Sequence, residues 1–186
     1  MDKTRIPVIV GTGQVTDTTS KPEEGRSPLQ LMHDAVKLAA AVMLGLLPAG
    51  LAVMFHGMKK SPLLGLLGLG LVWCNLSHWG FLNFMGALGL FTMAVGFTFL
   101  LVDRPTRGRQ LALALTLTAL FFTHIFRYPF ALCAVVGTAV VMYPSTRRLR
   151  PIVLPLVPAL ALMLLWLKVR PVALAGDMGP LSVHKE

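Results

Sequence analysis

The feature that most constrains this chain is a long stretch with almost no negative charge. Eight acidic side chains occur in 186 residues, yet only Asp103 lies between positions 35 and 176. A soluble domain needs charged residues over its surface, whereas 55% of this chain is hydrophobic and its mean hydropathy is +0.70. A lipid bilayer is therefore the solvent that this stretch fits.

Apolar segments separated by short polar turns fill the stretch. A helix needs about 20 residues to cross roughly 30 Å of hydrocarbon. The segments are 38–56, 62–76, 79–102, 110–126, 129–143 and 151–167. The second and the fifth are short, so we expect tilted partners, half-helices or re-entrant pieces there. The predicted fold class is all-α, a polytopic transmembrane helical bundle of five to six segments.

Glycines are frequent in the second and third segments. They are Gly65, Gly68, Gly70, Gly86, Gly89 and Gly96. Small residues let membrane helices approach closely, so the pattern predicts tight packing of these two segments. The alternative is that these glycines only add flexibility.

Basic residues concentrate in alternate turns between the apolar segments. They are Lys59, Lys60, Arg104, Arg107, Arg109, Arg147, Arg148 and Arg150. The two intervening turns carry only Arg127. Loops rich in Lys and Arg stay in the cytoplasm, so this alternation places the basic loops inside and, if all segments span, both termini outside. Clusters in this position indicate membrane orientation, and we expect no nucleic-acid partner.

The first 37 residues are more polar than the rest. Residues 5–10 form a short β-branched run that ends in Gly11-Thr-Gly13, which predicts a strand followed by a turn. Ser27 before Pro28 predicts the start of a helix. This strand-loop-helix segment, 1–37, is not expected to fold as an independent domain. A transmembrane domain over 38–170 and a tail over 171–186 complete the predicted organisation.

Two resemblances divide the chain near residue 41. The run Arg5-Ile-Pro-Val-Ile-Val-Gly-Thr-Gly-Gln-Val-Thr-Asp17, with Ser27-Pro-Leu-Gln-Leu-Met32, gives residues 4–40 a resemblance to the N-terminus of thiolases, the acetyl-CoA acetyltransferase family. The catalytic cysteines and the histidine of that family belong to later segments, and nothing after residue 41 matches them. The resemblance therefore does not imply thiolase activity.

The second resemblance concerns the apolar part. The pattern His78-Trp-Gly-Phe-Leu-Asn83-Phe-Met-Gly86, followed by Phe121-Phe-Thr-His124, resembles bacterial polytopic membrane proteins of the C-type, lipid-linked-sugar glycosyltransferase kind. It covers 42–170 and implies a multi-pass protein of the bacterial inner membrane, with polyprenyl phosphate or another anionic lipid as partner. The acidic residue of such transferases has no counterpart in 42–170, so the resemblance implies a fragment of the membrane domain that is inactive alone.

Two other functional classes stay open. A small transporter or channel would use Asn75, Asn83 and His124 to line a path. A mosaic or truncated reading frame with no dedicated function would explain why two unrelated resemblances meet without a linker.

The residues offer no complete catalytic constellation and no metal-ligand spacing. Cys74 and Cys133 are interpreted as small buried hydrophobes, and we expect neither a metal nor a cofactor. The candidate ligand-binding residues are His78, Asn83, His124 and Arg127, which the alternating topology brings to one polar rim near the outer face. There Arg127 would hold an anionic lipid phosphate, with the other three as hydrogen-bonding neighbours. The alternative is an interfacial turn whose Arg127 reaches the headgroups.

Overall fold

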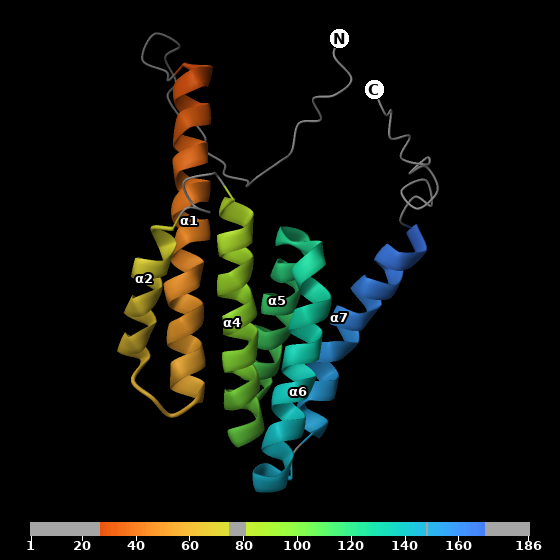
Figure 1. The fold of residues 1–186 in the computed structure, drawn as a ribbon. Coiled ribbons are helices and arrows are strands. Elements are labelled where there is room, and N and C mark those ends of the chain that lie inside the picture. Colours follow the sequence, from red (N-terminus) through yellow and green to blue (C-terminus); the bar gives the residue numbers. More distant parts are fainter. Residues whose placement is uncertain (1–26, 75–80, 148, 170–186) are drawn as a thin grey trace, which may run out of the picture.

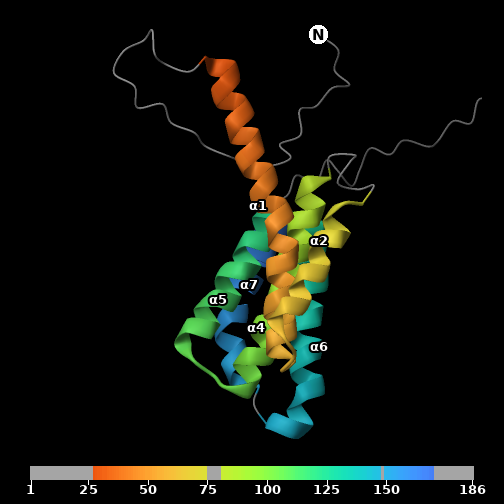
Figure 2. The ribbon, with the colours of Figure 1, turned by 90° about the vertical axis from the view of Figure 1, so that its left-hand side faces the viewer.

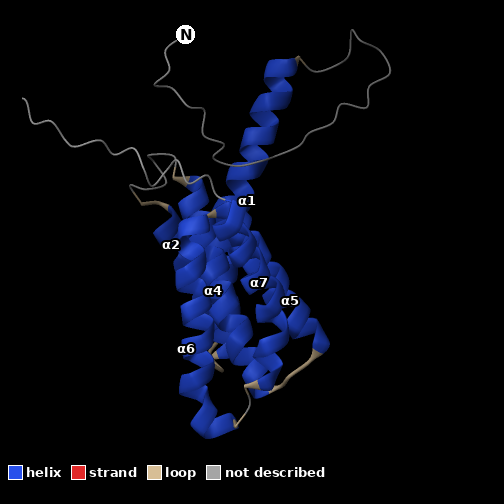
Figure 3. Ribbon diagram, turned by 90° about the vertical axis from the view of Figure 1, so that its right-hand side faces the viewer, coloured by secondary structure: helices blue, strands red, loops and turns tan. Residues whose placement is uncertain are grey.

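The computed structural model describes residues 27–74, 81–147 and 149–169, and every regular element in these ranges is helical (Figure 1; Figure 3). The elements are α1 (Pro28–Gly57), η1 (Pro62–Leu66), α2 (Leu67–Val72), α4 (Leu82–Asp103), α5 (Arg107–Thr123), η2 (Ile125–Arg127), α6 (Tyr128–Thr146) and α7 (Arg150–Val169). The all-α prediction is confirmed over these residues. The strand expected over 5–10 and the tail expected over 171–186 lie outside them.

Helix α1 begins where the sequence predicts a helix start. The backbone N–H of Ser27 donates to Gln30 Oε1 over 2.8 Å, and Ser27 Oγ accepts from the Gln30 N–H over 3.3 Å. This capping box satisfies two N–H groups at the helix start. Helix α1 then continues for 30 residues, past Pro48, to a length of about 45 Å. Its N-terminal part extends beyond the other helices (Figure 2).

Among the described residues, four helices are long and apolar enough to cross a membrane: α1, α4, α6 with the preceding η2 turn, and α7. The second predicted segment, 62–76, is not among them. Over its described residues it forms η1, of five residues, and α2, of six, which together cover only about 19 Å. Helix α5 has 17 residues and covers about 25 Å. Of the six predicted segments, four therefore reach spanning length as helices.

The fifth segment, predicted over 129–143 as a short piece, is longer in the structure. The helical stretch Ile125–Thr146 has 22 residues, because Pro144 lies inside α6 without ending it. A proline in a helix removes one N–H donor, but the turns around it keep theirs. The Thr146 hydroxyl donates to the Met142 carbonyl over 2.9 Å in this last turn. Of the alternatives for this segment, the half-helix is therefore wrong, whereas a tilted helix is compatible with the 22 residues.

Glycines set the packing of α1 on α4. Gly50 of α1 lies against Gly89 of α4, and Gly57 lies against Gly96. A Cβ atom on Gly57 would lie 2.7 Å from the Gly96 carbonyl oxygen, which is too close for a side chain. The two glycines of each helix are seven residues apart, so they share one face. Since both contacts advance in the same chain direction, α1 and α4 run parallel (Figure 1).

The short elements η1 and α2 explain how two consecutive long helices run in the same direction. The chain must return to its starting end between them, and η1 and α2 do so along α1 (Figure 1). Gly65 lies against Ala52, and Gly68 lies against Pro48. Except for Gly70, which meets nothing within 4 Å, the glycines of the second and third segments therefore bring each segment against α1. The sequence pattern predicts packing of the two segments against one another.

Helix α4 is the centre of the bundle. Of the most apolar part of α4, 56% is buried, compared with 17% for the corresponding parts of α1 and α7 and 28% for that of α6. Its inner residues pack against α5, α6 and α7. The largest buried side chains of this core are Leu101, Val102, Leu113, Leu117, Leu120, Tyr128 and Val135.

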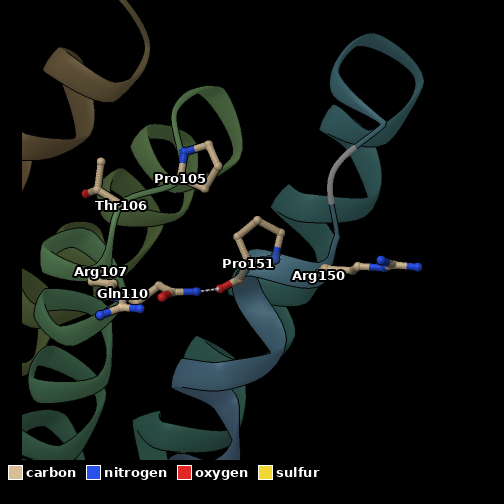
Figure 4. A pocket seen from close by; sticks show the side chains of 6 residues that line it. All are labelled: Pro105, Thr106, Arg107, Gln110, Arg150 and Pro151. Carbon is tan, nitrogen blue, oxygen red and sulfur yellow. Dashed lines mark hydrogen bonds between the residues drawn. The ribbon is translucent and has the colours of Figure 1, made fainter.

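The basic loops gather at one end of the bundle, which we name the basic end. Lys59 Nζ lies 3.1 Å from Asp103 Oδ1 and joins the turn after α1 to the end of α4. The Gln110 side chain of α5 donates from Nε2 to the Pro151 carbonyl of α7 over 3.0 Å (Figure 4). The η2 turn, which contains Arg127, lies at the opposite end (Figure 1).

Candidate functional site

The site is built on the turn between α5 and α6. The backbone N–H of His124 donates to the Leu120 carbonyl over 2.9 Å, and His124 then leaves helical geometry with φ −158° and ψ 88°. The N–H of Arg127 donates to the His124 carbonyl over 3.0 Å, which closes the short 3₁₀ turn η2. Residues three apart in such a turn lie on the same side. The fold therefore directs His124 and Arg127 toward one region.

Phe84, in the first turn of α4, lies between these two basic side chains. The Arg127 guanidinium carbon is 3.8 Å from the centroid of the Phe84 ring. The ring centroids of His124 and Phe84 are 6.1 Å apart with an interplanar angle of 71°. A cation over an aromatic face is attracted to the negative face of the ring, most strongly where water is excluded. Phe84 therefore holds Arg127 in place without neutralising its charge.

These side chains border a pocket of about 430 Å³ between α4, α6 and the η2 turn. It is lined by Phe84, Phe91, His124, Phe126, Arg127 and Phe130. Its walls are aromatic, and its two basic side chains both come from the α5–α6 turn. We refer to it as the arginine pocket.

Two polar atoms of the arginine pocket stand out. His124 Nδ1 and Arg127 Nε are buried and have no hydrogen-bond partner among the described residues. Buried polar groups in proteins are almost always hydrogen-bonded, so each such atom calls for an explanation. The Nε of Arg127 carries a hydrogen that needs an acceptor such as an oxygen. A bound ligand with such an acceptor would supply the missing hydrogen bond.

The structure brings together two of the four predicted site residues. His124 and Arg127 both line the arginine pocket. Asn83 precedes Phe84 in α4 and is half-buried, but it is not among the residues that line the pocket. His78 lies outside the described residues. His124 and Arg127 therefore lie together, and both contact the ring of Phe84.

The aromatic lining was not predicted from the sequence. Phe84 and Phe91 are seven residues apart in α4, and Phe126 and Phe130 are four apart across the η2–α6 junction. Both spacings place two rings on one helical face. This periodicity was available in the sequence, but only the packing of α4 on α6 shows that the two faces meet.

Other chemistry lies elsewhere. Within the described ranges, no three His, Cys, Asp or Glu side chains are grouped as they would be around a metal ion. Asp103 is paired with Lys59 at the basic end. It ends α4, whereas Arg127 contacts Phe84 at the start of that helix. Cys74 is half-buried and Cys133 is exposed, so the interpretation of Cys133 as a buried hydrophobe is wrong.

No family model, curated protein or solved structure matches this chain.

Proposed function

We propose that this chain is an integral membrane protein that binds the phosphate group of an anionic lipid in the arginine pocket. The observation that carries the proposal is Arg127. Its guanidinium is stacked 3.8 Å from the Phe84 ring centroid, and its buried Nε lacks a partner among the described residues. A guanidinium matches the geometry of phosphate oxygens and remains charged at any physiological pH.

The shape of the pocket favours a lipid over a small soluble ion. Phe91 lies two helical turns from Phe84, about 10 Å further along α4. Phe130 continues the aromatic wall on α6. A phosphate held by Arg127 would therefore have an apolar channel beside it for the first part of a hydrocarbon chain. His124, at the same rim, would donate a further hydrogen bond to the headgroup.

The side chains that line the arginine pocket support binding without catalysis. Transfer of a sugar from a lipid phosphate needs a carboxylate or a metal near the reacting bond. Asp103, the acid of the apolar region, is at the opposite end of α4 from Phe84. We therefore propose a binding module that is inactive alone.

The resemblance of residues 42–170 to lipid-linked-sugar glycosyltransferases refines this proposal. It makes polyprenyl phosphate the lipid of choice and the bacterial inner membrane the location. With the basic end in the cytoplasm, Arg127 would meet lipids of the outer leaflet. The four apolar helices are the evidence for a membrane location, and the arginine pocket is the evidence for an anionic lipid. The choice of a polyprenyl chain rests on the resemblance alone.

The test is lipid binding in phosphatidylcholine nanodiscs that contain a low fraction of polyprenyl phosphate, followed by native mass spectrometry. We expect Arg127→Gln to weaken retention of the lipid about tenfold, since about 1.4 kcal/mol corresponds to one charge-assisted hydrogen bond. Arg150→Gln, which removes the same charge at the basic end, is the control and should bind as the wild type does. Equal retention by both variants would refute the site.

A second measurement concerns catalysis. The purified chain is given polyprenyl-phosphate-linked sugar and a range of acceptors, and we expect no release of sugar. Turnover that is lost in Arg127→Gln would show that the module is an enzyme after all.

A further inference from the structure

A second pocket lies at the basic end, between the last turn of α1 and the loop that joins α4 to α5. Its volume is about 410 Å³. It is lined by His56, Gly57, Lys59, Lys60, Leu100, Asp103, Arg104 and Arg109. Four cationic side chains and one carboxylate border it, which leaves three positive charges in excess. We refer to it as the lysine pocket.

Two sets of contacts form the frame of the lysine pocket. Lys59 pairs with Asp103 over 3.1 Å and ties the turn after α1 to α4. Arg109 donates from Nη1 to the carbonyls of Leu100 and Arg104, over 2.7 Å each. Cations at a helix C-terminus offset its partial negative charge and satisfy its free carbonyls. Lys59 and Arg109 therefore have structural partners already.

Lys60, Arg104 and His56 are the basic groups that remain. Lys60 follows α1 directly, its N–H donating to the Phe55 carbonyl over 2.8 Å, and Arg104 follows α4, its N–H donating to Leu100 over 3.1 Å. These backbone bonds fix the starting points of both side chains at the border of one hollow. Among the described residues, the side-chain heads of Lys60 and Arg104 are in none of the ion pairs or hydrogen bonds at this end, although both border the pocket and the charge of Arg104 acts on the nearby Asp103 carboxylate.

A second hollow at the basic end also contains basic residues and serves as a comparison with the lysine pocket. It is lined by Pro105, Thr106, Arg107, Gln110, Arg150 and Pro151. Gln110 uses its amide on the Pro151 carbonyl, and Arg150 extends away from that contact (Figure 4). Arg107 and Arg150 come from different helices but do not converge. The lysine pocket differs because four cationic side chains border it, compared with two in this hollow.

We propose that the lysine pocket binds a phosphate group through Lys60 and Arg104, with His56 as an additional donor. Ammonium and guanidinium groups are the side chains that proteins use for phosphate, and the volume suits a headgroup-sized ligand. The phosphate is carried either by a lipid of the adjacent leaflet or by a soluble phosphorylated molecule. The site is separate from the arginine pocket, which lies at the other end of α4.

The experiment uses the full chain in nanodiscs and the Arg127→Gln background, so that the arginine pocket does not contribute. One variant carries Lys60→Gln with Arg104→Gln. The matched control carries Arg107→Gln with Arg150→Gln, which removes the same charge from the same end. The first arm titrates phosphatidylglycerol into phosphatidylcholine discs and measures bound lipid by native mass spectrometry. The second arm titrates inorganic pyrophosphate into phosphatidylcholine discs by calorimetry. The thermal unfolding midpoint of each variant verifies that it is folded.

We expect the Lys60/Arg104 variant to bind at least about tenfold more weakly than the control in one of the two arms. A difference in the first arm identifies a lipid headgroup, and a difference in the second identifies a soluble phosphate. Equal binding by the two variants in both arms would overturn the proposal, because the cations would then act only through the general surface potential.

Discussion

Gly50 and Gly89 show at the level of single atoms why α1 and α4 lie so close together. A Cβ atom on Gly50 would meet the Gly89 carbonyl oxygen, whereas a Cβ atom on Gly45, one and a half turns earlier in the same helix, would meet nothing within 4 Å. Where no hydrophobic effect drives helices together, close van der Waals contact between small residues is a main source of association. Gly50 therefore has a role in packing that Gly45 lacks.

This difference predicts opposite effects of the same substitution. Gly50→Ala should destabilise the bundle by about 2 kcal/mol, because the added methyl group forces the helices apart. Gly45→Ala should be neutral or stabilising by up to about 1 kcal/mol, because alanine favours the helix. Unfolding by sodium dodecyl sulfate titration in mixed micelles measures both. A smaller loss for Gly50→Ala than for Gly45→Ala would show that the glycine contact is not formed.

Tyr128 gives a second prediction at this scale. The side chain is fully buried, and its hydroxyl donates to the Ala159 carbonyl of α7 over 2.6 Å. Tyr128→Phe should cost about 1 kcal/mol, since hydrogen bonds between membrane helices are worth this or somewhat less. Tyr143→Phe in the same helix is the control, because Tyr143 is 38% exposed, and it should cost nearly nothing. The same unfolding titration compares them, and equal losses would contradict the α6–α7 contact.

The residues of the site were only partly predictable. His124 and Arg127 stand out in the sequence because polar groups at membrane depth are costly and therefore conspicuous. Phe84 does not, since a phenylalanine in an apolar helix is ordinary. Its role depends on which residue of α4 faces the α5–α6 turn, and this is a property of the packing of three helices. Asn83, its polar neighbour, was the more obvious choice but lies beside the pocket lining.

At the scale of elements, prolines inside helices leave carbonyl groups that other elements must satisfy. Pro155 lies inside α7 and has no N–H for the carbonyl of Pro151, four residues earlier. Gln110 of α5 donates to that carbonyl over 3.0 Å (Figure 4). A side chain of α5 therefore supplies the hydrogen-bond donor that Pro155 of α7 lacks, which is how prolines are tolerated in membrane helices.

This hydrogen bond predicts an energetic coupling between positions 110 and 155. Gln110→Met should cost about 1 kcal/mol in the native sequence, because the Pro151 carbonyl loses its donor. In a Pro155→Ala background the new N–H serves that carbonyl, so the cost of Gln110→Met should nearly vanish. A double-mutant cycle by unfolding titration gives the coupling energy, expected at about 1 kcal/mol. Equal costs in the two backgrounds would mean that Gln110 has no such role.

The boundaries of the elements were predictable to different degrees. The start of α1 follows from Ser27 and Gln30, because a capping box is local chemistry. The apolar pattern of the fifth segment predicts an end at Tyr143, whereas α6 continues through Pro144 to Thr146. The second segment was counted with the others because hydropathy does not show where a helix breaks. Its return along α1 depends on glycine contacts that involve another helix.

At the scale of the whole molecule, apolar helices and the separation of charge are what the sequence predicts best. Both follow from composition along the chain and need no knowledge of packing. Four of the described helices have spanning length, and their outward faces carry large exposed apolar side chains, among them Leu154 at 63% and Val141 at 78%. Such surfaces are typical of helices that lipid or a partner protein covers.

Membrane integration follows directly. Membranes from cells that express the chain should keep it in the pellet after washing with alkaline carbonate, because the apolar helices have no soluble alternative. A peripheral protein of the same membranes, released by the wash, is the control. Recovery of the chain in the supernatant would be incompatible with a bundle held in lipid.

The most direct test of the account is the location of the two ends of the bundle across the membrane. Single cysteines replace Leu29, at the exposed start of α1, and Arg104 and Arg150, at the basic end, in a chain without Cys74 and Cys133. A membrane-impermeant maleimide is added to intact cells and then to opened membranes. We predict that position 29 reacts from outside, and that positions 104 and 150 react only once the inner face is opened. Labelling of 104 and 150 from opposite faces, or of 29 from the same face as both, would contradict a bundle whose basic loops share one side.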